Sequence, residues 1–215
     1  MTYKVDIVPE RFVITTGSSA GFILAFLACL DAGQKVAVTA PGYPAYTNII
    51  QSLDLTTVTI ALGQENNWKL TTDDLRDAEK THGGIDALLI ASPANPTGTM
   101  LSKQALTELS LDCAHAGRWF FSDEIYHGLT YAQEATSALQ VGDHNRLIVM
   151  NSFSKYFSMT GWRIGWMIVP PQMVRVVERL QQNLFISAPT LSQYAACAAL
   201  TQSAQGELQK HVELY

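Results

Sequence analysis

The chain has 215 residues, of which 47% are hydrophobic and only 15% are charged, and its formal net charge is −5. Such a chain buries a large core, and its acidic balance gives nucleic-acid binding no electrostatic support. The N-terminus has no apolar region typical of a signal peptide, and the apolar stretch 20–30 is shorter than the roughly 20 residues that cross a bilayer. We therefore expect neither a nucleic-acid partner nor a membrane.

The three cysteines, Cys29, Cys113 and Cys197, are widely spaced and match no metal-binding pattern. We expect them to be reduced and buried, which is typical of a cytoplasmic protein. The five histidines also lack the spacing of metal ligands, so no metal is predicted.

The first half of the chain predicts strands that alternate with helices. A short strand at 13–16 leads through Gly17-Ser18-Ser19 into a helix that ends before Gly33, and we expect Ser18 or Ser19 to be its N-cap. The following strands are predicted at 35–40, 55–60 and 86–92, the helices at about 46–53 and 72–83, and a polar loop at 64–69. Thr71 and Asp74 form a weak version of the capping box before the second of these helices.

The second half continues the same alternation. Ser102 begins a helix that carries Leu106, Leu109 and Cys113 on one face. Strands are then predicted at 118–122, 147–150 and 164–169, and helices at 171–185 and 191–214. Strands that are apolar throughout indicate a sheet covered by helices on both faces, so the predicted fold is a three-layer α/β/α domain.

A distinctive polar group follows most of the predicted strands. In chain order these groups are Gly17-Ser18-Ser19, Tyr43, Asn95, Asp123 with Tyr126, and Ser152 with Ser154 and Lys155. Ligands of open α/β sheets bind beyond the carboxyl ends of the strands. We therefore expect these residues to converge on one crevice.

Some of these groups are suited to bind a phosphate. Gly17-Ser18-Ser19 offers hydroxyls and free backbone N–H groups at the positive end of a helix, and Arg163 offers a bidentate guanidinium. Ser152 and Ser154 supply further hydroxyls. Taken alone, the serine pair is more simply an N-cap, and Arg163 a surface charge.

The remaining groups are suited to bind an aromatic ring. Asp123 is a carboxylate for a ring nitrogen, Tyr126 and Asn95 are donors for a ring oxygen, and Tyr43 between prolines can stack on the ring. Singly, these residues are typical of a salt bridge, of turns and of packing. Together with a reactive lysine, Lys155, they describe the ligand pyridoxal phosphate, whose carbonyl condenses with a lysine amine.

Five motifs make the chain resemble the class I/II aminotransferases of the aspartate aminotransferase family, which are fold-type I pyridoxal-phosphate enzymes. The motifs are T-T-G-S-S-A, A-P-G-Y-P-A-Y, S-P-A-N-P-T-G-T, S-D-E-I-Y and S-F-S-K-Y-F-S-M-T-G-W-R-I-G-W. They occur in the family's order between Thr15 and Trp166. The resemblance implies the family's large domain, with a mostly parallel mixed sheet, and an aminotransferase that acts on an amino acid and a 2-oxo acid.

The resemblance also implies a role for each site residue. Lys155 matches the lysine that forms the internal aldimine and later shuttles the proton, and Asp123 matches the partner of the pyridinium nitrogen. Tyr126 and Asn95 match the donors to the ring 3-oxygen, and Tyr43 matches the stacking aromatic. The phosphate cup corresponds to Gly17, Ser18, Ser19, Ser152, Ser154 and Arg163. In relatives, the Asn95–Pro96 peptide is cis.

Family members are considerably longer than this chain. We expect residues 1–185 to form the cofactor-binding large domain without its N-terminal arm, and 186–215 to begin the helical connection to an absent small domain. In relatives the small domain supplies the arginine that binds the substrate carboxylate, so the substrate cannot be assigned. The family builds its site across a subunit boundary, which implies a homodimer.

Three other interpretations share some of these residues. Ser152-Phe153-Ser154-Lys155 matches the S-x-x-K motif of penicillin-binding proteins, but the later S-D-N-like and K-T-G elements have no good match. A carbon–sulfur lyase would use the same cofactor site. A non-catalytic sensor domain of a transcription regulator would also bind the cofactor, and would need a DNA-binding domain that this chain lacks.

Overall fold

A computed structural model describes residues 3–131 and 133–214. Seven strands form one mixed sheet in the order β1-β7-β6-β5-β4-β2-β3. The strands are β1 (Phe12–Thr15), β2 (Lys35–Ala40), β3 (Thr56–Ala61), β4 (Ala87–Ala91), β5 (Trp119–Asp123), β6 (Leu147–Ser152) and β7 (Gly165–Ile168). The sheet confirms the predicted α/β fold: the central strands β4, β5 and β6 are almost entirely buried, whereas the edge strand β3 alternates between buried and exposed residues.

Strand β7 is the exception to the parallel arrangement, since it pairs antiparallel with both β1 and β6. Val13 of β1 lies opposite Met167, and Met150 of β6 lies opposite the same residue. Because β7 runs in the reverse direction, its first residues lie at the edge where the parallel strands end. Arg163 precedes β7 and therefore reaches the same edge as the residues that follow β5 and β6.

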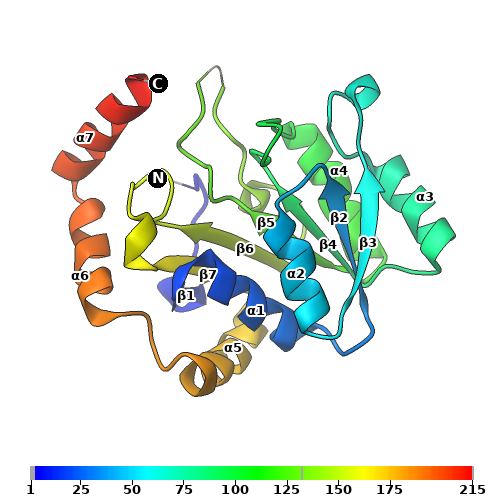
Figure 1. The fold of residues 1–215 in the computed structure, drawn as a ribbon, viewed down its shortest axis with the longest axis horizontal. Helices are drawn as coiled ribbons and strands as arrows, with labels where there is room; N and C mark the ends of the chain where they lie inside the picture. Colours follow the sequence, from blue (N-terminus) through cyan, green and yellow to red (C-terminus); the bar gives the residue numbers. More distant parts are fainter. Residues whose placement is uncertain (1–2, 132, 215) are drawn as a thin grey trace.

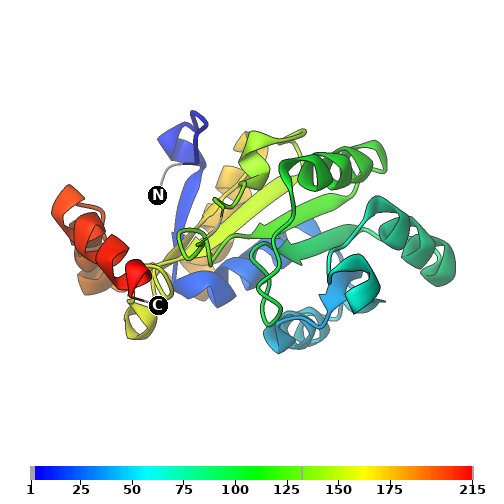
Figure 2. The same ribbon diagram turned by 90° about the horizontal axis from the view of Figure 1, so that it is seen from above.

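Helices cover both faces of the sheet, as Figures 1 and 2 show. The helices that cover it are α1 (Gly17–Cys29), α2 (Pro44–Ser52), α3 (Thr72–His82), α4 (Lys103–His115) and α5 (Pro171–Leu184), and they are followed by α6 (Thr190–Ala199) and α7 (Gln202–Glu213). One core packs α1, α2 and α5 against the sheet through Phe26, Ile50 and Val177. The opposite core packs α3 and α4 through Leu75 and Leu106. Figure 2 shows α1 and α4 on opposite sides of the sheet, which completes the three layers.

Several local predictions are confirmed. Strand β2 has the predicted bounds. Thr71 accepts a hydrogen bond from Asp74 N while the Asp74 carboxylate accepts one from Thr71 N, so the capping box forms. Ser102 is the N-cap of α4, and Leu106, Leu109 and Cys113 are buried on it. The Asn95–Pro96 peptide bond is cis.

Other local predictions are wrong. Helix α1 already begins at Gly17, whose φ of +75° turns the chain into the helix, so Ser18 and Ser19 lie inside the first turn and the N-cap is Thr16. The polar loop 64–69 contains a short 3-10 helix, Gln64–Asn66. The single helix predicted at 191–214 is two helices, because the Thr201 side chain accepts a hydrogen bond from Ala204 N and starts α7 anew.

The C-terminal helices α6 and α7 lie beside the sheet rather than over it (Figure 1). The outer face of α6 is apolar and exposed, with Leu191 78% and Tyr194 74% accessible. Cys197 on α6 is exposed, against expectation, because this face packs on no other described element, whereas Cys113 is buried. No helix in the described ranges is long and apolar enough to cross a membrane. Residues 1, 2 and 215, included in the predicted domains 1–185 and 186–215, lie outside the described residues.

Candidate active site

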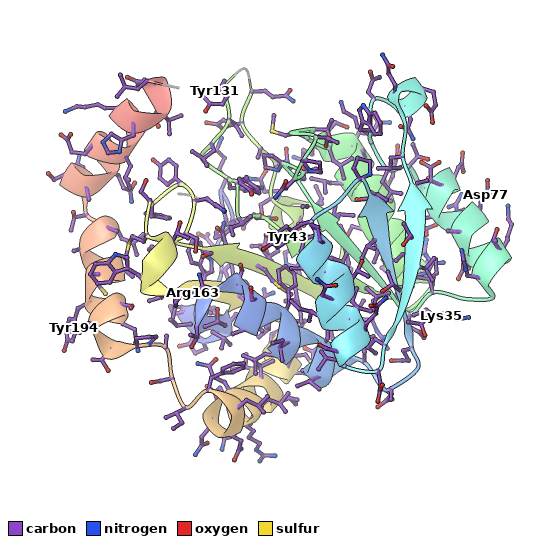
Figure 3. The ribbon with its side chains drawn as sticks, viewed as in Figure 1. Lys35, Tyr43, Asp77, Tyr131, Arg163 and Tyr194 are labelled. Carbon is purple, nitrogen blue, oxygen red and sulfur yellow. The ribbon has the colours of Figure 1, made fainter. Side chains whose placement is uncertain are left out.

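A cavity opens at the carboxyl edge of the sheet. It is lined by Ser18, Ser19, Phe22, Tyr43, Ala45, Tyr46, Ile49, Asn95, Asp123, Ile125, Tyr126, Ser154, Lys155, Thr160 and Arg163. All the predicted site residues line it except Gly17 and Ser152, which lie directly behind the lining. Figure 3 shows Tyr43 at the start of α2 and Arg163 beside the beginning of α1, with Lys35 far away at the opposite edge of the sheet.

One end of the cavity is built for an anion. Gly17 sits at the start of α1, where the first turn leaves backbone N–H groups without acceptors inside the helix. A side chain at Gly17 would place its Cβ 2.5 Å from Arg163 Nη2, so glycine is needed for the guanidinium to approach the helix. Arg163 has φ +49° and donates through Nη1 to Thr160 O at 3.1 Å. The helix end and the guanidinium thus face one space.

A second glycine, Gly165 in β7, allows the beginning of α1 to pack closely on the sheet. A Cβ there would lie 2.8 Å from Asn151 O and 3.1 Å from Gly17 C, so only glycine lets the beginning of α1 pack this closely on β7. The sequence analysis did not single out Gly165. The repeated glycine of T-G-W-R-I-G-W was the available signal for it.

Ser152 is the last residue of β6 and Ser154 follows it, and the two side chains have different positions. Ser152 is 1% exposed, and its hydroxyl lies 3.1 Å from Ile164 O, which can only accept, so the hydroxyl donates to that carbonyl. The same oxygen accepts from Ser154 N at 3.0 Å and lies 2.8 Å from Ser154 Oγ. Ser152 therefore holds Ser154, which lines the cavity. A serine buried in this way is badly placed as an S-x-x-K nucleophile.

The other end of the cavity contains a buried carboxylate. Asp123 is 3% exposed, and Tyr46 Oη donates to its Oδ2 at 2.6 Å while Ile125 N donates to its Oδ1 at 3.0 Å. Burial raises the pKa of Asp123 to about 6, although the two hydrogen bonds and the charge of Lys155 favour the ionised form. Asp123 therefore has the donor partner that a buried carboxylate requires.

Tyr46 was missed as a site residue. It is 7% exposed and its ring meets Phe22 edge-on at 5.2 Å between centroids, which fixes the hydroxyl toward Asp123. Burial and the neighbouring Asp123 raise the pKa of Tyr46 well above its usual value, so Tyr46 keeps its proton and donates. The sequence held a signal, because the tyrosines of A-P-G-Y-P-A-Y are one helical turn apart.

Asn95, Tyr126 and Lys155 line the cavity between its two ends. Asn95 Nδ2 donates to Tyr126 Oη at 3.3 Å, so these two groups, from the loops after β4 and β5, lie side by side. Lys155 Nζ lies 5.8 Å from the centre of the Tyr126 ring. Burial and Asp123 raise the pKa of Tyr126, which therefore remains a donor at neutral pH. Tyr43 is 44% exposed at the rim.

The described residues contain no group of three or more histidine, cysteine, aspartate or glutamate side chains that could hold a metal ion. The groups available in the cavity are an amine, a carboxylate, an amide, phenol hydroxyls, serine hydroxyls and a guanidinium.

Comparison with known proteins agrees with this arrangement. The chain is 41% identical over 213 residues to a valine–pyruvate aminotransferase of Mycobacterium tuberculosis, covering 99% of this chain and 54% of that protein. It is 33% identical to an aspartate aminotransferase of Thermotoga maritima, with 92% and 52% covered. A crystal structure of an aminotransferase from Mycobacterium tuberculosis superimposes with a TM-score of 0.91 at 41% identity, covering 97% of this chain and 56% of that one.

The chain thus spans about half the length of the relatives it matches. A model of the family described as "Aminotransferase class I and II" matches residues 1–215. The chain belongs to the class I and II aminotransferases.

Proposed function

We propose that this chain supplies the cofactor site of a pyridoxal-phosphate-dependent aminotransferase that moves an amino group between an amino acid and a 2-oxo acid. The observation that supports this most is the convergence, in one cavity, of Lys155, Asp123, the Asn95–Tyr126 pair and the anion site at Gly17 and Arg163. Each of these groups complements a different part of one ligand.

The residues present fit pyridoxal phosphate. The first turn of α1, with Ser18, Ser19, Ser154 and Arg163, would hold its phosphate, because a helix N-terminus and a guanidinium both favour an anion. At the far end, Asp123 would hold the ring nitrogen. Its carboxylate already accepts from Tyr46 and Ile125, so it is fixed in orientation before any ligand binds.

When bound, the cofactor withdraws electrons from the α-carbon of an amino-acid substrate. Asp123 would keep a proton on the ring nitrogen, since its pKa of about 6 leaves it mostly ionised at pH 7 and a cation beside it favours that form further. Asn95 and Tyr126 would donate to the ring oxygen and hold the ring in plane. Lys155 would bind the cofactor covalently and carry the proton at the reacting carbon. Tyr43 would cover the ring at the rim and exclude water.

The remaining parts of this proposal concern the whole protein. Residues 1–185 would be the cofactor-binding domain, and 186–215 would begin the connection to a further domain. The exposed apolar face of α6 would be covered in the complete protein, which we propose to be a cytoplasmic homodimer. The particular amino acid and 2-oxo acid are left open, since relatives with different substrate names, valine–pyruvate and aspartate, both match the chain.

The test is to incubate the chain with pyridoxal phosphate, reduce it with borohydride and locate the adduct by peptide mass spectrometry. We expect the adduct on Lys155 and its loss in Lys155→Arg. Lys35→Arg is the matched control, because Lys35 lies at the opposite edge of the sheet and bonds the carbonyl of His82 (Figure 3). An adduct of equal yield on Lys35, or an unchanged yield in Lys155→Arg, would refute the proposal.

A further inference from the structure

A second cluster of buried polar groups lies behind the ring end of the cavity. Glu124 and His127 flank Ile125 and Tyr126 in the chain, and they are 1% and 5% exposed. Neither lines the cavity. Two titratable groups buried together need an arrangement of protons that satisfies both, and the hydrogen bonds around them limit the possibilities.

The two oxygens of Glu124 have unequal surroundings. Oε1 accepts from Ala138 N at 2.8 Å, Ser137 Oγ at 3.0 Å and Ser122 Oγ at 3.2 Å. Oε2 is buried and has no hydrogen-bond partner among the described residues, but it lies 3.5 Å from His127 Nδ1. Only one oxygen is therefore held as an acceptor, and the other faces the imidazole.

The other ring nitrogen of His127 fixes the tautomer. Nε2 lies 2.9 Å from Ser92 O, and a backbone carbonyl can only accept, so Nε2 carries a proton. In the neutral ring Nδ1 then presents a lone pair to Glu124 Oε2. An ionised Glu124 beside a neutral His127 would place two acceptors face to face in the interior, which is unfavourable. Exactly one further proton must lie between these two atoms.

Burial decides which atom holds that proton. A carboxylate–imidazolium pair would require two charges in the interior, whereas a carboxylic acid and a neutral imidazole require none. Burial raises the pKa of Glu124 to about 8, helped by the neighbouring Asp123, and lowers the pKa of His127 to about 4. The Tyr3 hydroxyl, another titratable group near Glu124, also stays protonated because burial raises its pKa.

We propose that Glu124 and His127 form a neutral pair, with the shared proton on Glu124 Oε2 directed at His127 Nδ1, and that this brace positions Tyr126 against Asn95. His127 ties the loop after β5 to the carbonyl of Ser92, whose N–H also donates to Asp123 O at 3.2 Å. Ser92 begins the loop that carries Asn95. Glu124 and His127 are therefore positioning residues for the two ring-oxygen donors, and only this consequence depends on the proposed function.

The proton placement is tested by nuclear magnetic resonance of the 15N-labelled chain without cofactor, with the His127 signals assigned by their loss in His127→Gln. At pH 7 we expect a protonated Nε2 and an unprotonated Nδ1, unchanged down to pH 5. A doubly protonated ring at pH 7, or a proton on Nδ1 alone, would overturn the proposal. Because no pyridoxal phosphate is present, failure of the chain to bind that cofactor would refute the proposed function and leave this result intact.

The positioning role is tested by the side-chain amide signal of Asn95, assigned by its loss in Asn95→Ala. Glu124→Gln can still donate to His127 Nδ1 and accept the three hydrogen bonds at Oε1, so the Asn95 signal should stay in place. Glu124→Met, of similar length, can do neither and should shift it. His127→Gln keeps a donor for Ser92 O but loses Nδ1, so it should also shift the Asn95 signal. This variant provides the test if Glu124→Met does not fold. The positioning role is contradicted if the Asn95 signal does not move in His127→Gln. It is also contradicted if that signal moves as far in Glu124→Gln as in Glu124→Met.

Discussion

Replacing Tyr46 by phenylalanine removes one hydroxyl from the interior and leaves the ring contact with Phe22 in place. That hydroxyl donates to Asp123 Oδ2 at 2.6 Å, in a site where Asp123 is 3% exposed. Its loss leaves Oδ2 without this donor, while Ile125 N still donates to Oδ1. The ionised form of Asp123 should lose more stabilisation than the neutral form, so the effect of the substitution on the free energy of unfolding should depend on pH.

The magnitude follows from the difference between charged and neutral hydrogen bonds. A bond to a charged acceptor contributes about 1.5–3 kcal/mol and one to a neutral acceptor about 1 kcal/mol. The difference of roughly 0.5–2 kcal/mol corresponds to a rise of about half a unit to one and a half units in the pKa of Asp123, at about 1.36 kcal/mol per unit. Starting from about 6, the ionised fraction at pH 7 would fall from about 90% to between about 25% and 75%.

The assay is urea unfolding of the parent chain and of Tyr46→Phe at pH 5 and pH 8.5, without cofactor. The pKa of Asp123 is raised in the folded state from 3.8 to about 6, so its contribution to stability is full below pH 4 and is lost as pH rises through 6. In Tyr46→Phe the pKa of Asp123 is expected to be higher, so the stability contributed by this group continues to fall up to a higher pH. Tyr46→Phe should therefore cost about 1 kcal/mol at pH 5 and about 1.5–3 kcal/mol at pH 8.5.

Tyr43→Phe is the matched control, because Tyr43 precedes Tyr46 by one helical turn and is 44% exposed. It should change the free energy of unfolding by less than about 0.5 kcal/mol at both pH values. Glu124, whose pKa is about 8, also titrates in this range, but it does so in every variant and cancels when they are compared at one pH. An equal cost of Tyr46→Phe at pH 5 and pH 8.5 would show that the hydroxyl does not favour the ionised Asp123.

Further predictions concern the anion site and the fold. Gly17→Ala should cost about 1–3 kcal/mol of stability, because φ is +75°, and should weaken pyridoxal phosphate binding by displacing Arg163. Arg163→Gln should weaken that binding roughly tenfold to a hundredfold in fluorescence titrations, with little effect on unfolding; unchanged affinity would remove Arg163 from the site. Thr71→Ala should cost about 1 kcal/mol through the lost capping bond to Asp74 N, measured by urea unfolding. Leu75→Ala should cost about 2–5 kcal/mol in the same assay, because Leu75 is fully buried, and a smaller cost would show that the core closes around the space.

Most of the sheet could be predicted because its strands are short apolar runs that end at clear turn residues, as β2 does at Pro41-Gly42. The cavity could be predicted because parallel strands end at one edge. The direction of β7 could not, since an apolar run has the same pattern in either direction. The helix break at Thr201 also lies within a continuous helical pattern, and only the capping bond reveals it.

The unpredicted parts of the site depend on contacts between distant residues. Tyr46 has the burial pattern of any core aromatic, and its bond to Asp123 joins residues far apart in the chain. The pairing of Glu124 with His127 is similarly invisible, because i,i+3 spacing in a loop does not imply contact. Residue types and their spacing predict what the side chains could bind, whereas the residues that hold them in place depend on the three-dimensional arrangement.

The pairing of the first strand with the last has a consequence for how the site is made. Among the described residues, strand β1 pairs only with β7, so its hydrogen bonds cannot form until β7 has left the ribosome. Closing so long a loop is slow, and the step that closes it also brings Gly17 to Arg163. Asp123 lies in β5, and Asn95 and Tyr126 follow β4 and β5, which can pair earlier. During synthesis the end of the cavity at Asp123 should therefore form first and the end at Gly17 and Arg163 last. Tight binding of the cofactor would then begin only when the sheet is complete.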